Sequence, residues 1–177
     1  MNIFVLDEDP VLAARMLCDV HCNKMVLESA QMLANCFPLE QLESLDCPRT
    51  KTGGVRKYAH YNHPSSKWVR ESRSNMQWLL DHAFEIENER LRRGFNPHFI
   101  MGFLQWVKIN FKKTKIPEKY TLSKFAVAIA DHCECRKIEN DFDSLPTVQK
   151  YRLYYIWDKQ KIAKWKNGNC PQWFIKP

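Results

Sequence analysis

The sequence has no apolar run long enough to span a membrane, and its first residues lack the basic-then-apolar pattern of a secretion signal. It contains only five glycines in 177 residues, with 45% hydrophobic and 27% charged residues. This balance is typical of a globular protein and excludes a disordered chain. We therefore expect a cytoplasmic protein without a membrane segment, folded as one domain over residues 1–177.

Several motifs of common enzyme classes are also missing. No Walker loop, GxGxxG, GxSxG or HExxH occurs, which leaves a nucleotide-driven motor or a serine hydrolase without support. Seven cysteines are present, but none forms a CxxC pair and no second pair follows at zinc-finger spacing. We therefore expect reduced thiols, no metal site and no cofactor.

The chain is basic, because 27 Lys and Arg residues outnumber 20 Asp and Glu residues and give a formal charge of +7. Part of this excess lies in a mostly irregular stretch between residues 38 and 64, which carries Arg49, Lys51, Arg56 and Lys57. A basic domain of this size typically binds nucleic acid, and DNA is the partner we expect. A positive surface that serves only solubility is the alternative.

The helical pattern starts at Asp9 and Pro10, because the carboxylate accepts free backbone N–H groups and proline suits the first helical turn. This helix is expected to run to Phe37 with a break near Cys18–Asp19, and Met1–Leu6 before it to be a strand or an extended segment. Further helices are expected over residues 65–93, capped by Ser65–Ser66 with a break at Ser74, and over 98–111, 122–134 and 147–165. The sequence thus predicts a mainly α fold, a single compact helical domain with a short extended N-terminal segment and a long basic loop.

Two faces of the first long helix differ in chemistry. One face is apolar and is expected to be buried: Cys22, Val26, Ala30, Leu33 and Phe37. The other carries a base, an amine, an acid and two amides at spacings of three and four: His21, Lys24, Glu28, Gln31 and Asn35. A solvated helix face and a catalytic face both fit this second stripe.

Aromatic and basic residues also gather near Tyr58–Pro64 and in the last helix. The first stretch holds two tyrosines, two histidines and Asn62 just before a helix, which fits either a packed aromatic loop or a binding loop. The last helix interleaves tyrosines and tryptophans with Arg and Lys. Rings that stack on bases beside cations that meet phosphates suit a binder of extruded bases, although rings packed inward with lysines in water give the same pattern.

Three pieces of the chain resemble the pyrimidine-dimer DNA glycosylase family of phages, the endonuclease V type. The first is Asp19-x-His21 followed by Glu28, and the second is Tyr61-Asn62-His63-Pro64. The third is the helix from Glu85 that ends in Arg92-Arg93-Gly94-Phe95-Asn96. The chain is also similar to a broader group of small phage proteins that open N-I-F-x-L-D-x-D-P and end A-K-W…P-x-W-F. The first resemblance covers about residues 1–96, the second nearly the whole chain.

The resemblance implies a DNA repair enzyme that flips a pyrimidine out of the helix and cuts its glycosidic bond, with or without lyase activity. It assigns the catalytic carboxylate to Glu28 and the attacking group to the N-terminal α-amine. The resembled family exposes a small hydroxyl residue after methionine removal, whereas this chain begins Met1-Asn2. Lys24 is therefore a substitute amine, and His21 a residue that holds Glu28 or a phosphate.

Further residues are expected to bind DNA or the substrate: Asp19, Gln31, Arg56, Lys57, His60, Asn62, His63, Lys67, Arg152, Lys164 and Trp165. We expect a monomer. Two other functions remain open at this stage. One is a phage transferase that adds an amino acid or a similar group to a modified thymine in DNA, and the other is a DNA-binding accessory protein without catalysis.

Overall fold

The computed structural model describes residues 1–168 and 170–175 and confirms the mainly α fold class, since this part of the chain contains no strand. The α-helices are α1 (Pro10–Arg15), α2 (Asp19–Ala34), α3 (Leu39–Glu43), α4 (Pro64–Val69), α5 (Arg73–Arg92), α6 (Met101–Ile109), α7 (Glu134–Ile138) and α8 (Thr147–Asp158). Two 3₁₀ turns, η1 (Phe111–Lys113) and η2 (Phe142–Ser144), complete the list. None of the helices described is both long and apolar enough to cross a bilayer.

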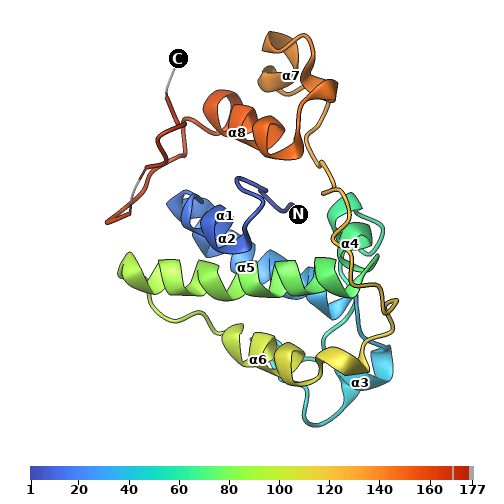
Figure 1. Cartoon of the computed structure of the whole chain (residues 1–177). Coiled ribbons are helices and arrows are strands. Elements are labelled where there is room, and N and C mark those ends of the chain that lie inside the picture. Colours follow the sequence, from blue (N-terminus) through green and yellow to red (C-terminus); the bar gives the residue numbers. More distant parts are fainter. Residues whose placement is uncertain (169, 176–177) are drawn as a thin grey trace.

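Helix α5 is the centre of the molecule and crosses it in green in Figure 1. Helices α1 and α2 pack on one side of α5, and α6 packs on the other. The predicted apolar stripe of α2 faces this packing, because Cys22, Val26 and Leu33 are completely buried. Helix α8 lies beyond α1 and α2 and carries the short α7.

The predicted break between α1 and α2 is confirmed. Asp9 caps α1, since its carboxylate accepts hydrogen bonds from the backbone N–H groups of Val11 and Leu12. The helix ends at Arg15, and Cys18 stands before α2 with extended backbone. The chain therefore turns between the two helices, and α2 ends at Ala34 rather than at the predicted Phe37.

The helix predicted over residues 65–93 is likewise divided, but its caps differ from those expected. His63 caps α4 through its ring nitrogen, with Pro64 as the first helical residue, so the expected caps Ser65–Ser66 lie inside the helix. Ser72 starts α5 by accepting from the N–H of Asn75, which moves the break to residues 70–72. Gly94 follows α5 with a φ of +79°, as predicted for a residue just past a helix end.

The N-terminal segment is extended, as predicted, and is buried under α8 (Figure 1). Ile3, Phe4, Val5 and Leu6 are each at most 5% exposed. The Phe4 ring stacks on His21 of α2 and meets the Tyr155 ring of α8 edge-on. The first residues of the chain are thus held between two helices.

Two predicted helices are wrong in extent. Residues 121–130 form no helix, because side chains of other elements bind their backbone. Asn75 accepts from the N–H of Ser123, and the Tyr151 hydroxyl accepts from the N–H of Ala128. The last helix ends at Asp158 rather than residue 165, and the Asp158 carboxylate accepts from the first N–H groups of α7.

Candidate active site

Glu28 lies in the second half of α2, with its carboxylate turned toward the first residues of the chain. It is 8% exposed, and its Oε2 accepts a hydrogen bond of 2.9 Å from the backbone N–H of Asn2. The α-amine of Met1 lies 3.7 Å from the same oxygen, and Lys24 Nζ lies 3.3 Å from Oε1. A buried carboxylate is thereby brought into contact with two amines, which is an arrangement for nucleophilic and acid–base chemistry.

These groups line a cleft of about 230 Å³. Its lining comes from the N-terminal segment, α2, Ala128, helix α8 and Lys159 just past the end of α8. The cleft residues are Met1, Asn2, Phe4, His21, Lys24, Met25, Glu28, Ala128, Tyr154 and Lys159. All three residues expected to be catalytic, Glu28, His21 and Lys24, therefore lie together.

His21 is held as a neutral ring. It is 5% exposed and shares a hydrogen bond between its Nδ1 and the Tyr155 hydroxyl. Burial first, and then the charges of Lys159 and Lys24, lower the pKa of His21 to about 3. The ring is therefore uncharged at neutral pH and serves the cleft as a support for Phe4.

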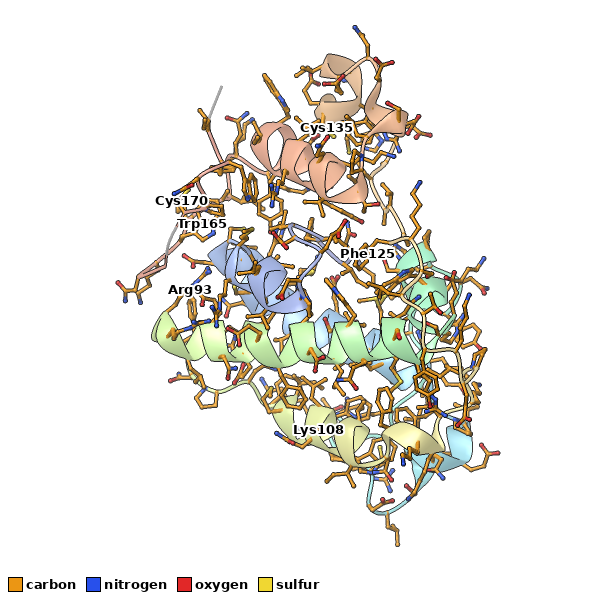
Figure 2. The ribbon with its side chains drawn as sticks, viewed as in Figure 1. Arg93, Lys108, Phe125, Cys135, Trp165 and Cys170 are labelled. Carbon is orange, nitrogen blue, oxygen red and sulfur yellow. The ribbon has the colours of Figure 1, made fainter. Side chains whose placement is uncertain are left out.

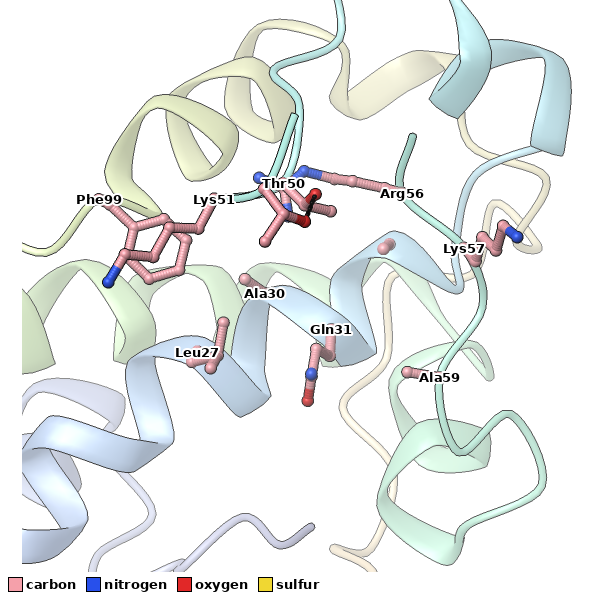
Figure 3. A pocket seen from close by; sticks show the side chains of 11 residues that line it. Leu27, Ala30, Gln31, Thr50, Lys51, Arg56, Lys57, Ala59 and Phe99 are labelled. Carbon is pink, nitrogen blue, oxygen red and sulfur yellow. Dashed lines mark hydrogen bonds between the residues drawn. The ribbon is translucent and has the colours of Figure 1, made fainter. Parts of the chain in front are cut away.

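A second cavity, which we name the loop cavity, lies on a neighbouring face of α2. It measures about 280 Å³ and is lined by Leu27, Ala30, Gln31 and Ala34 of α2, Thr50, Lys51, Thr52, Arg56, Lys57 and Ala59 of the basic loop, and Phe99. Figure 3 shows Leu27 and Ala30 facing the loop that carries Thr50, with Phe99 at one end. Gln31 thus lines this cavity and not the cleft around Glu28.

Arg56 and Lys57 differ in what they can do in the loop cavity. Arg56 donates to the carbonyls of Pro48 and Arg49, and its guanidinium lies 4.0 Å from the centre of the Phe103 ring. Burial lowers the pKa of Arg56, and its role is to shape the loop. Lys57 is exposed at the rim, where its ammonium can meet a phosphate.

The residues expected between His60 and Lys67 lie at the surface beside the cleft. His60 has a φ of 49°, a left-handed conformation that is uncommon for a residue other than glycine. His63 caps α4 and lines an open hollow with residues 127–132, which shares Ala128 with the Glu28 cleft. Burial and then the positive N-terminus lower the pKa of His63. Asn62 and Lys67 are exposed.

Four other residues expected to bind DNA make contacts within the fold, of which Lys164 contributes its backbone carbonyl while its side chain is exposed. Asp19 accepts from Arg93 and from the backbone N–H of Lys166, and its own N–H donates to the carbonyl of Lys164. Trp165 donates to the carbonyl of Met16. Figure 2 shows Trp165 close to Arg93. Asp19, Lys164 and Trp165 therefore tie the C-terminal segment to the start of α2.

Arg152, the fourth, binds the N-terminal segment, and its side chain is 30% exposed. It donates to the carbonyl of Leu6 and pairs with Asp7 at 3.3 Å. Two residues on the α8 side of the cleft, Tyr154 and Lys159, were not among those expected at the site. Both residues belong to the aromatic and basic pattern of the last helix. That pattern alone does not indicate which rings and cations face Glu28.

Metal-binding groups are not a feature of the described chain. No group of three or more His, Cys, Asp or Glu side chains within residues 1–168 and 170–175 is placed to hold an ion. Six cysteines are buried free thiols: Cys18, Cys22, Cys36, Cys47, Cys133 and Cys135. Burial raises the pKa of Cys22 and Cys36 to about 12, so both remain protonated and unreactive at neutral pH.

Comparison with known proteins gives one match. A family model described as pyrimidine dimer DNA glycosylase matches residues 1–101. No curated protein and no solved structure matches the chain. The matched region contains the N-terminal segment, α2 with Glu28, and the basic loop, whereas Ala128 and α8 lie outside it.

Proposed function

The chain belongs to the pyrimidine dimer DNA glycosylase family, and we propose that it cleaves the bond between a damaged pyrimidine and its deoxyribose in DNA. The single observation that carries this proposal is the contact of Glu28 with the Met1 α-amine and Lys24 in one cleft. An amine beside a buried carboxylate is the equipment needed to attack a sugar carbon and to stabilise the charge that develops on it.

The proposed attacking group is the α-amine at the start of the chain, and Lys24 is the alternative amine. In the unprotonated state the amine attacks C1′, an N–C1′ bond forms, and the C1′–N bond to the base breaks. The base leaves with that electron pair and takes up a proton, while the amine releases one. Because the sugar becomes positive during this step, the Glu28 carboxylate at its side lowers the barrier.

A lyase step follows from the same intermediate. The covalent adduct opens to an iminium ion, which acidifies the C2′ proton of the sugar. Loss of that proton expels the 3′-phosphate and cuts the strand. We propose that Glu28 also serves as the base here, since no other carboxylate lines the cleft among the residues that the structure describes.

The loop cavity is the proposed receptor of an extruded nucleotide. Its apolar surface from Ala30, Ala34 and Phe99 suits a nucleobase, and Lys51 and Lys57 at its rim suit the phosphates on either side. The loop cavity and the Glu28 cleft lie on neighbouring faces of α2, so one bound DNA molecule can reach both. The exposed Asn62 and Lys67 are proposed to contact the DNA backbone between the loop cavity and the Glu28 cleft.

Glu28→Gln tests the proposed role of the carboxylate. The amide keeps the shape of the side chain but removes the charge, so base release should fall by about two orders of magnitude or more. DNA affinity should stay equal or rise, because a negative charge near phosphate is lost. Base release is measured by mass spectrometry of duplex oligomers that carry one pyrimidine dimer, with Glu40→Gln as a control on the exposed side of α3.

The same spectra separate the functions that remain open. A mass gain on the base would identify a transferase, and unchanged oligomers with tight binding would identify an accessory DNA-binding protein. Borohydride added during the reaction traps an iminium ion on the protein, and peptide mapping then assigns it to the N-terminus or to Lys24. Full activity in Glu28→Gln contradicts the proposal.

A further inference from the structure

The side chain of Asn2 is fixed at both ends by residues that lie far away in the sequence. Its Oδ1 accepts from the Tyr151 hydroxyl at 2.7 Å and from the backbone N–H of Ile3 at 2.8 Å. Its Nδ2 donates to the carbonyl of Ala128 at 3.0 Å. An amide held by three hydrogen bonds has a single orientation, and this orientation sets the direction of the adjoining peptide toward Glu28.

Tyr151 closes this arrangement into a ring of hydrogen bonds. Its hydroxyl donates to Asn2 and also accepts from the backbone N–H of Ala128 at 3.0 Å. Tyr151 is completely buried, and burial raises its pKa, so the hydroxyl keeps the proton that it donates. Both Tyr151 and Ala128 lie outside residues 1–101, the part matched by the family model.

The ring acts directly beside the reacting groups. The backbone nitrogen of Asn2 lies 2.9 Å from Glu28 Oε2, and the Met1 amine lies 3.7 Å from the same atom. Among the residues that the structure describes, the polar contact of the Met1 side chain is a weak one of 3.4 Å between its sulfur and the Ser66 hydroxyl. The position of the amine therefore depends on the anchoring of Asn2, whichever of residues 1 and 2 carries it.

We propose that Tyr151 is a positioning residue for the attacking amine, acting through the side chain of Asn2 to hold that amine against Glu28. The proposal rests on the proposed glycosylase function and assigns the C-terminal half of the chain a part in catalysis. Tyr151 touches neither the DNA nor the reacting atoms. Its contribution is to the geometry of attack, where a displacement of about 1 Å can cost about 100-fold in rate.

Tyr151→Phe is the test, because it retains the ring and removes only the hydroxyl. We expect kcat for base release to fall about 10-fold or more, with unchanged KM for dimer-containing DNA and a lower yield of borohydride-trapped complex. Ser72→Ala is the matched control, since it also removes one buried hydroxyl and its hydrogen bond but lies at the start of α5. Thermal denaturation gives the change in Tm of both variants, so that their losses of kcat can be compared at equal loss of stability.

A double-mutant cycle distinguishes positioning from general weakening of the fold. Asn2→Ala removes the same link from the other side, so Tyr151→Phe added to Asn2→Ala should reduce kcat no further. The inference would be overturned if the losses of kcat in the two single variants multiplied in the double variant. It would also be overturned if Tyr151→Phe lost no more kcat than Ser72→Ala at an equal change in Tm. Wild-type protein that releases no base overturns the proposed function itself, whereas an active wild type with an equally active Tyr151→Phe overturns only the role of Tyr151.

Discussion

Two buried histidines show how single residues set the pH range in which this fold is stable. His82 is 1% exposed and stacks on Trp78, and neither of its ring nitrogens has a hydrogen-bond partner within the described part of the chain. Burial lowers the pKa of His82 to about 3, the same value that His21 has in the cleft. Both rings are therefore neutral in the folded protein under conditions in which an exposed histidine is charged.

This difference predicts a loss of stability in mild acid. The unfolded chain binds a proton at each histidine below the ordinary pKa of 6.5, whereas the folded chain does so only near 3. The free energy of unfolding should therefore fall as the pH drops from about 6.5 toward 3, by up to about 1.4 kcal/mol per pH unit for each histidine. Urea denaturation at pH 7 and pH 5 measures the slope.

His82→Phe removes the contribution of this histidine while it keeps a ring against Trp78. Its stability should depend less on pH than that of the wild type, and His132→Gln, a change at an exposed histidine, should leave the dependence as it was. Equal slopes in the wild type and His82→Phe would show that this histidine does not remain neutral in the folded state.

The residues of the site divide into those that helical spacing reveals and those that it does not. His21, Lys24 and Glu28 could be predicted together, because positions three and four apart share one face of a helix. Asn35, on the same stripe, is completely buried, and its amide exchanges hydrogen bonds with both backbone groups of Ala59. Lys159 joins the cleft only through the packing of α8, which no local pattern encodes.

At the scale of helices, one side chain joins three elements. Arg93 follows the end of α5 and is completely buried. It binds Glu89 within the helix at 2.8 Å, Asp19 at the start of α2 at 3.0 Å, and the carbonyls of Arg15 and Leu17 at the end of α1. The sequence suggested only a favourable charge at a helix end, because the buried carbonyls that surround Arg93 come from tertiary packing.

Arg93→Met should therefore be strongly destabilising. The change leaves Asp19 and Glu89 without their cation and two buried carbonyls without a donor, which should cost about 3–5 kcal/mol in the free energy of unfolding. Arg92→Met is the matched control, since Arg92 also pairs with Glu85 and Glu89 but its side chain is 47% exposed, and it should cost about 1 kcal/mol or less. Chemical denaturation gives both values, and similar losses of stability in the two variants would contradict the proposed role of Arg93 in joining the three helices.

Helix ends could be predicted well where a cap is local in sequence and poorly where it is not. Asp9 and Pro10 mark the start of α1 by themselves, and Gly94 marks the end of α5. Residues 122–134 carry a helical pattern, yet Asn75 and Tyr151 from distant elements bind the backbone of Ser123 and Ala128, and residues 122–130 form no helix. Propensity is a weak guide when tertiary hydrogen bonds decide the conformation.

The whole molecule consists of a matched N-terminal part and a C-terminal part that completes its cleft. Residues 1–101 supply Glu28, Lys24 and the basic loop, and residues beyond supply Ala128, Tyr154 and Lys159 on the opposite wall. With a formal charge of +7, the chain also carries cations next to two neighbouring faces of α2, at Lys24 and Lys159 in the cleft and at Lys51 and Lys57 around the loop cavity. This distribution suits a duplex that lies across α2.

The charge distribution predicts that the affinity for DNA depends on salt concentration and that lysines around the loop cavity contribute to this dependence. The logarithm of the binding constant for duplex DNA should fall linearly with the logarithm of salt concentration, by about 0.9 for each phosphate neutralised. If Lys57 at the rim of the loop cavity contacts one phosphate, Lys57→Ala should weaken binding to all DNA sequences. It should also reduce the magnitude of the salt slope by about 0.9, the value for one phosphate contact. Fluorescence anisotropy of a labelled duplex over a series of salt concentrations measures both quantities.

Lys108→Ala is the control, because it removes the same charge from α6, on the far side of α5 from α8 (Figure 2). Both variants lower the formal charge equally, so a general effect of net charge would change their slopes alike. A contact at the loop cavity changes only the slope of Lys57→Ala. An affinity of the wild type that stays constant from low to moderate salt would show that phosphate contacts are not the basis of binding. Equal slopes in the two variants would show that DNA does not bind at the loop cavity.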